Sequence, residues 1–304
     1  MDAPSIFSRK NVAYACATLC CLLWGSSYPA IKSGYELFQI ATDDVPSKIV
    51  FAGYRFLFAG TLLLLFALVQ RKPIARLNPR QCGQLAILGV TQTSIQYVFF
   101  YVGLAFTTGV KGSIMNATGT FFSVLLAHFI YQNDKLSYNK AIGCILGFAG
   151  VMLVNFNHSL SDFSFVWQGD GFVVLAAFIL SAATLYGKRI SQTVDPTVMT
   201  GWQLAFGGLV LVGGGYLTGG TLEVHSSAAV LVLAYLTLPF ALWSVLLKHN
   251  RVSMIAPFNF VIPVAGTVLS AIFLGENIFE PKYAVALVLV CAGIWWVNKV
   301  GQHR

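Results

Sequence analysis

One arginine, Arg55, lies inside a long apolar stretch of the sequence. A charge in hydrocarbon is costly, so an arginine at such a position normally serves a partner or a pathway. One interpretation is a cationic contact for a carboxylate or phosphate group of a bound solute. The alternative is that its long side chain reaches the membrane surface or pairs with Glu36, Asp43 or Asp44. Lys32, near the end of the preceding apolar stretch, is a second candidate for attracting an anionic group.

Amide and phenol side chains form a polar stripe in a third apolar stretch. Gln92 and Gln96 are four residues apart, as are Tyr97 and Tyr101. Residues at this spacing share one face of a helix, so the amides and the phenols are expected on neighbouring faces. The stripe either lines a cavity, where the amides orient a ligand, or holds helices together through interhelical hydrogen bonds.

Two asparagines occupy corresponding places in two later stretches. Asn116 lies in one, and Asn259 lies between Pro257 and Pro263 in the other. Proline frees backbone carbonyls and can break a helix near the middle of a membrane, although a simple kink satisfied by neighbouring helices is the alternative. The remaining candidates for the walls of a cavity are aromatic: Trp24, Tyr28, Tyr186 and Trp243.

Sets of residues that would support catalysis or bind a metal are not found in the sequence. Asp170 has no second membrane aspartate to pair with, no serine stands in a GxSG-like context with a usable histidine, and no HExxH occurs. The six cysteines form no CxxC pair, so neither a zinc site nor a disulfide framework is expected. We therefore expect no enzyme, no metal and no cofactor.

The composition indicates a membrane protein. Hydrophobic residues make up 57% of the 304 residues and charged residues 10%, whereas soluble domains carry about 25% charged residues. Charges cluster between apolar runs of roughly 18–24 residues, the length of helix that crosses a hydrocarbon layer about 30 Å thick. The predicted spans cover residues 13–33, 47–70, 83–106, 108–131, 139–156, 170–190, 197–217, 227–248, 252–274 and 281–299.

The distribution of basic residues predicts the orientation. If the N-terminus is cytoplasmic, fourteen of the nineteen Lys and Arg residues lie on the cytoplasmic side, four lie on the opposite side, and Arg55 lies within a span. This bias follows the positive-inside rule and places both termini in the cytoplasm of a multi-pass protein of the inner cell membrane. Although the net charge is +8, basic residues at the ends of spans argue against nucleic-acid binding.

A repeated pattern indicates two halves. The motif AG-x-x-x-V-N ends a span at Ala149–Asn155 and again at Ala292–Asn298, 143 residues later. Five spans in each half is an odd number, so the second half enters the membrane from the opposite face. The predicted fold is an all-α integral membrane protein with ten transmembrane helices, arranged as two inverted five-helix repeats over residues 1–156 and 157–304.

Three motifs resemble those of the drug/metabolite transporter superfamily, EamA type. Trp24–Lys32 is similar to its first-span signature, Tyr54–Gly60 to its second-span arginine motif, and Ala256–Glu276 to its P…LGE segment. The first half departs from the pattern, with Phe121 and Asn133-Asp134 where the family usually has Pro and LGE. The resemblance implies a ten-span carrier, commonly an exporter of amino acids, other metabolites or drugs.

We therefore expect a secondary carrier with a central cavity bounded by spans 1, 3, 4, 6, 8 and 9. A gradient must drive transport, because the sequence has no P-loop to bind ATP. No Asp or Glu lies centrally in a span. Facilitated efflux or substrate exchange is therefore expected at least as much as proton antiport. An importer or a lipid or drug carrier is the alternative within transport, and a channel or membrane receptor is the alternative class. The expected partners are a small-molecule substrate and the lipid bilayer. A monomer is expected, with a homodimer as the alternative.

Overall fold

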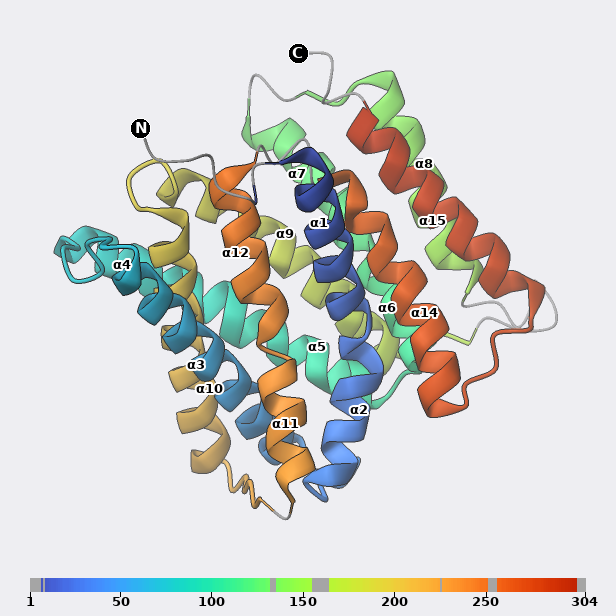
Figure 1. Ribbon diagram of the computed structural model, residues 1–304. Helices are drawn as coiled ribbons and strands as arrows, with labels where there is room; N and C mark the ends of the chain where they lie inside the picture. The colour runs from blue at the N-terminus through green and yellow to red at the C-terminus, as the bar shows by residue number, and fades with distance from the viewer. Residues whose placement is uncertain are drawn as a thin grey trace.

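The protein is described by a computed structural model over residues 7, 9–131, 135–154, 164–224, 226–250 and 256–299, and every regular element in these ranges is helical (Figure 1). The helices coincide with the expected spans. The first five correspond to α1 (Lys10–Gly25) with α2 (Ser27–Leu37), α3 (Val45–Val69), α4 (Pro79–Leu88) with η2 (Gly89–Ile95) and α5 (Gln96–Ala105), α6 (Gly109–Asn116) with α7 (Thr118–Ile130), and α8 (Tyr138–Leu153). The second five correspond to η3 (Trp167–Gly171) with α9 (Phe172–Ile190), α10 (Pro196–Leu217), α11 (Ser227–Tyr235) with α12 (Leu238–His249), η4 (Ala256–Phe260) with α14 (Val261–Leu274), and α15 (Pro281–Lys299).

Several helices are suited to a membrane by length and composition. Five helical stretches are long and apolar enough to cross one: Val45–Val69, Pro79–Ala105, Gly109–Ile130, Trp167–Ile190 and Pro196–Leu217. Further apolar helices, such as Tyr138–Leu153 and Pro281–Val297, are shorter. Large apolar side chains on their outer faces, including Leu65, Phe129 and Ile272, are exposed. Since such faces are unfavourable in water, they indicate contact with lipid.

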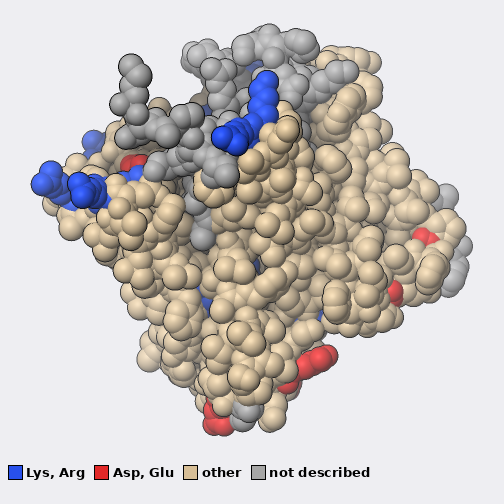
Figure 2. All heavy atoms as spheres, viewed as in Figure 1, with Lys and Arg blue, Asp and Glu red and all other residues tan. Residues whose placement is uncertain are grey.

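Charged side chains gather at the two ends of the bundle. Figure 2 shows a broad middle region of uncharged residues, with basic groups toward the end where α1 begins. Arg71, Arg76 and Arg80, in and after the connection from α3 to α4, are exposed at this end. The exposed Glu36 and Asp43 lie at the other end. The first turn of α1 and the last turn of α15 lie at the same end (Figure 1). We call it the basic end.

Four of the expected spans are interrupted in the described residues. The breaks fall at Ser26, at Ala117, at Leu236-Thr237, and at the 3-10 turn η4. Proline accounts for the first and third, since Pro29 and Pro239 donate no hydrogen bond to the preceding turn. Pro257 lies in the 3-10 turn η4, which leads directly into α14. The third span contains a π-helical stretch, η2, which the sequence did not predict.

Two pairs of helices pack with their backbones in close contact. α3 lies along α10 on one flank, and α8 lies along α15 on the other (Figure 1). A methyl group on Gly208 would lie 2.6 Å from the Leu57 nitrogen, and one on Gly150 would lie 2.7 Å from the Ala286 carbonyl oxygen. A methyl group on Gly293 would similarly lie 2.9 Å from the Gly147 nitrogen. The glycines of the two AG-x-x-x-V-N motifs thus permit the same helix–helix contact from opposite sides.

Part of the sequence interpretation falls outside the described residues. Asn133-Asp134 and the expected boundary between residues 156 and 157 lie there, as does Arg251. Phe121, the other departure from the family pattern, is fully buried on α7.

Candidate functional site

A cavity of about 360 Å³ lies between helices of both halves of the sequence. Its walls come from α2, α6, α7, α9, η4, α14 and α15. The expected cavity included spans 3 and 8, but none of its described lining residues belongs to these two spans, and α15 contributes instead. Aromatic side chains explain the difference, because Phe56, Tyr97 and Phe240 pack together where spans 2, 3 and 8 meet.

Three of the predicted site residues meet in this cavity. Tyr28 is 2% exposed, and the Asn116 amide nitrogen donates to its hydroxyl oxygen at 3.0 Å. Asn259 lines the same cavity and lies in the turn η4. Both asparagines therefore occupy helix breaks, where the regular backbone ladder ends. The Asn116 Oδ1 is buried and has no hydrogen-bond partner among the described residues.

Hydroxyl groups make up much of the remaining polar lining, and the sequence interpretation missed them. Ser113, Thr120 and Ser123 come from α6 and α7, and Ser181 and Thr184 come from α9. Their spacings of three and seven residues place them on one face of each span. That spacing was the available signal. It is weak because Ser and Thr are common on the packed faces of membrane helices.

Arg55 is buried away from the cavity lining. Its Nε donates to the Leu236 carbonyl oxygen at 3.1 Å and its Nη1 to the Tyr101 hydroxyl at 2.8 Å. The guanidinium carbon also lies 5.1 and 5.4 Å from the ring centres of Phe56 and Phe240. Because Arg55 is 2% exposed and forms no ion pair with the described carboxylates, the alternative of a surface-reaching or acid-paired arginine is wrong. Arg55 instead binds the backbone at the break between α11 and α12.

Aromatic candidates lie close to Arg55. The Trp24 and Trp243 rings are 5.0 Å apart, and Trp24 also contacts Phe240. Tyr97 packs on Phe56 with ring centres 4.2 Å apart. The structure therefore brings Trp24, Tyr97, Trp243 and Arg55 into one aromatic region beside the cavity.

The remaining candidates lie outside the described lining of the cavity. Gln96 is buried and its Oε1 has no partner among the described residues. Gln92 is half-buried in the π-helix η2. A π-turn has a wider repeat than an α-turn, so the four-residue spacing no longer defines one face there. Tyr186 packs against the cluster around Leu85 and Leu88.

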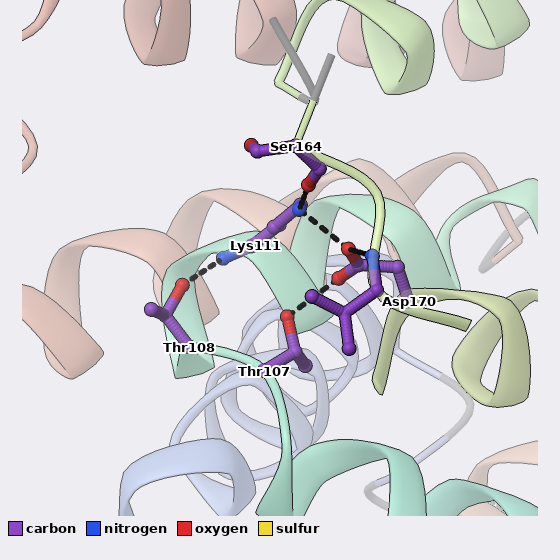
Figure 3. A network of polar contacts seen from close by, with 6 residues as sticks. Thr107, Thr108, Lys111, Ser164 and Asp170 are labelled. Atoms are coloured by element: carbon purple, nitrogen blue, oxygen red, sulfur yellow. Dashed lines mark hydrogen bonds and ion pairs between the residues drawn. The ribbon is translucent and has the colours of Figure 1, made fainter. Parts of the chain in front are cut away.

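An ionic network joins the start of α6 to η3 and the segment before it (Figure 3). Lys111 on α6 donates from Nζ to the Asp170 carboxylate at 2.5 Å and to the Ser164 carbonyl oxygen at 2.7 Å. Asp170, which is 1% exposed, also accepts from the Thr107 hydroxyl at 2.7 Å. Thr108 caps α6 by accepting from the Lys111 backbone nitrogen. The first turn of α6 is thereby fixed to η3.

Two further side chains hold the same turn. The Glu276 carboxylate, which follows α14, accepts from the backbone nitrogens of Gly109 and Val110, each at 2.8 Å. A carboxylate at this place also complements the helix dipole. Lys32 in the middle of α2 donates to the Thr107 carbonyl oxygen at 2.8 Å. We call Lys32, Lys111, Asp170 and Glu276 the α6 clasp.

The described residues contain no group of three or more His, Cys, Asp or Glu side chains arranged to hold a metal ion.

Comparisons with known proteins give a consistent result. The model of the EamA-like transporter family matches twice, over residues 11–156 and 167–299. An uncharacterized transporter of Archaeoglobus fulgidus is 24% identical over 292 residues, covering 93% of this chain and 96% of that protein. A probable amino-acid metabolite efflux pump of Salmonella typhimurium is 25% identical over 301 residues, covering 94% of each chain. A solved structure titled only "Crystal structure of protein" shares the fold, with a TM-score of 0.68 and 18% identity over 96% of this chain and 98% of that one.

Proposed function

The chain belongs to the EamA-like transporter family, and from this membership we propose that it is a secondary carrier that exports a small metabolite by alternating access. The family resemblance expected from the motifs is confirmed. Relatives are named transporters or efflux pumps, so the protein is a transporter-family member and not an enzyme, as expected. The name of the Salmonella relative supports an amino acid or related compound as substrate, and export as the direction.

We also propose ten spans in two inverted five-helix repeats, with both termini in the cytoplasm and the basic end facing it. The double match of the family model supports two repeats, as do the matching glycine contacts of α8 and α15. The position of the first turn of α1 and the last turn of α15 at one end supports an even number of spans. The exposed arginines at that end support the orientation.

The cavity at the helix breaks is the observation that carries the proposal. Tyr28, Asn116 and Asn259 are positioned to orient a solute, and Ser123, Thr184 and Val297 continue the lining toward the basic end. At the other end the α6 clasp closes the bundle. A carrier in this arrangement would take up its solute from the cytoplasm and release it once the clasp has opened.

The predicted residues outside the lining belong to the same proposal. Trp24, Arg55, Tyr97 and Trp243 would border the route when the two parts of span 8 separate, with Gln92, Gln96 and Tyr186 packed beside it. Lys32 would be released with the clasp. The route needs no nucleotide, and a gradient of the solute or exchange for a second solute would drive it.

Transport is tested with purified protein in liposomes loaded with amino acids, organic acids, sugars and cationic drugs. Mass spectrometry should show selective loss of some compounds compared with protein-free liposomes. Asn116→Ala should abolish that loss, while Asn139→Ala, which changes an exposed asparagine on α8, should not. Acceleration by the same compound outside would identify a carrier rather than a channel. Loss of no compound, or an unaffected Asn116→Ala protein, would contradict the proposal.

A further inference from the structure

We propose that the cavity selects solutes of no net charge that present N–H or O–H donors, and that it excludes net cations and net anions of similar size. Zwitterions and uncharged hydroxylated compounds both belong to this class. The inference rests on the carrier function proposed above and defines the chemistry of its substrate.

The first reason is the absence of ionised side chains from the described lining. None of these residues is Lys, Arg, His, Asp or Glu. The nearby cations are engaged elsewhere, because Arg55 donates to Leu236 and Tyr101, and Lys32 and Lys111 belong to the α6 clasp. An isolated charge that leaves water without a counter-charge is strongly disfavoured. A zwitterion carries its own counter-charge and avoids most of this penalty.

The second reason is the direction of the hydrogen bonds in the walls. A hydroxyl group has one proton to donate. Ser123 and Ser181 donate theirs to the Gly119 carbonyl oxygen at 2.8 and 2.7 Å, and Thr184 donates to the Leu180 carbonyl oxygen at 2.7 Å. Each of these hydroxyls retains only lone pairs for a solute.

The amide of Asn116 adds to this bias. It donates to Tyr28 and leaves a buried Oδ1 that accepts from no described residue. These bonds leave the Tyr28 hydroxyl proton and one Asn116 N–H as donors, and they leave unused lone pairs on Ser123, Ser181, Thr184 and the Asn116 Oδ1. A solute that supplies donors satisfies them, whereas one that supplies only acceptors leaves buried polar groups unpaired.

The test adds solutes matched in size to the liposome mixture described above, so that every transported compound is scored by net charge. Asparagine is compared with aspartate and 2,4-diaminobutyrate, and galactose with galacturonate and galactosamine. Valine is compared with its isomer trimethylglycine, which has no net charge and no N–H donor. Within each set of compounds that the protein transports, the uncharged compound that carries donors should leave the liposomes at least roughly tenfold faster than its counterparts. A tenfold difference is the effect of about one well-placed polar contact.

Equal or faster movement of a charged member, or of trimethylglycine, would overturn the inference while leaving the carrier function intact. Movement of no compound would instead remove the carrier function, and the selectivity with it. The two failures are therefore distinguishable.

A charge placed in the cavity gives a second test. Ser123→Asp should raise transport of the cationic member relative to the uncharged one by roughly tenfold, since a charge-assisted contact is added. Ser123→Asn, of the same size but neutral, should leave the ratio unchanged. Thr120→Asp replaces the first variant if that variant does not insert. An unchanged ratio in an active, inserted Asp variant would show that the solute does not pass the cavity, and would overturn the inference.

Discussion

Arg55 shows what a single buried charge does in this bundle. Its two hydrogen bonds reach the carbonyl of Leu236, at the break between α11 and α12, and the hydroxyl of Tyr101 on α5. A helix that lacks a backbone donor at a break leaves carbonyl oxygens unpaired, and an unpaired carbonyl in hydrocarbon is costly. Arg55 therefore joins one half of the sequence to the interrupted helix of the other.

Arg55→Ala should insert normally and lose transport by roughly ten- to a hundredfold, because a hydrogen bond to a charged group is worth about 1.5–3 kcal/mol. Tyr101→Phe removes one of the two bonds and should have a smaller effect. Initial rates of solute loss from liposomes measure both. Arg80→Ala, at an exposed position, is the control. Unchanged transport in Arg55→Ala would contradict a role for this side chain in the route.

The sequence identifies Arg55 as unusual but not what it binds. One of its two acceptors is a backbone carbonyl 181 residues away, and the backbone has no sequence signature. Asn116 and Asn259 were predictable because polar amides stand out in apolar stretches and prolines flank the second. The cavity hydroxyls were harder to recognise, since Ser and Thr also bond to their own helix in ordinary packing.

At the scale of elements, the first turn of α6 is held from α2, from η3 and from the segment after α14. The α6 clasp contains two cations and two carboxylates. Removing one member of a buried pair leaves the other unpaired, at a cost of about 3–5 kcal/mol. The clasp therefore favours a fully closed or a fully open end over intermediates.

Asp170→Asn or Glu276→Gln should shift the population toward a bundle open at the clasp. In a protein without its native cysteines, Ser113→Cys should then react several times faster with an impermeant maleimide added on that side. The control is Glu280→Gln, which removes an ion pair of 2.8 Å between Glu280 and Lys282, near neighbours in the chain. Unchanged reactivity of Ser113→Cys in both clasp variants would show that the clasp is not the closure.

Gly208 and Gly213 on α10 provide a matched test of the helix contacts. Gly208→Ala should lower the thermal unfolding temperature, since overpacking costs about 1–3 kcal/mol and the added methyl would meet backbone at 2.6 Å. A methyl on Gly213 meets nothing within 4 Å, so Gly213→Ala should be neutral or slightly stabilising. Thermal unfolding in detergent compares the two. Equal effects would mean that the contact between α3 and α10 is not tight.

The positions of the helices could be predicted from the sequence, but the breaks and π-helical turns inside them could be predicted only in part. Apolar length defines a span, and proline marks the breaks near Pro29, Pro239 and Pro257. The π-helical stretch η2 contains no proline. It packs against other helices, including α10, and a local pattern does not record such contacts.

At the scale of the whole molecule, the distribution of charge orients the proposed fold in its membrane. Exposed basic groups gather at one end, and the large apolar faces lie between the ends. The positions of Lys and Arg between the apolar runs predicted this arrangement, because it depends on many residues and not on any one contact. The position of the cavity was less predictable, since it depends on which of several polar faces the packing leaves unfilled.

Cys82 allows the orientation in the membrane to be tested with a native cysteine. It is exposed at the start of α4, toward the basic end. An impermeant maleimide should modify it in inside-out vesicles but not from outside intact cells. Asp43→Cys, at the opposite end, should show the reverse. Modification of Cys82 from outside would invert the proposed topology.

The protein has two kinds of region: the tightly packed helix pairs, α3 with α10 and α8 with α15, and the cavity between them. On the flanks, backbone touches backbone, and a methyl group added to a contacting glycine such as Gly208 or Gly150 is obstructed. Between them, side chains from both halves of the sequence line the cavity. Under natural selection the flanks should therefore change slowly while the centre diversifies. New substrates can then arise on an unchanged framework, and laboratory evolution of specificity should be directed at the central residues alone.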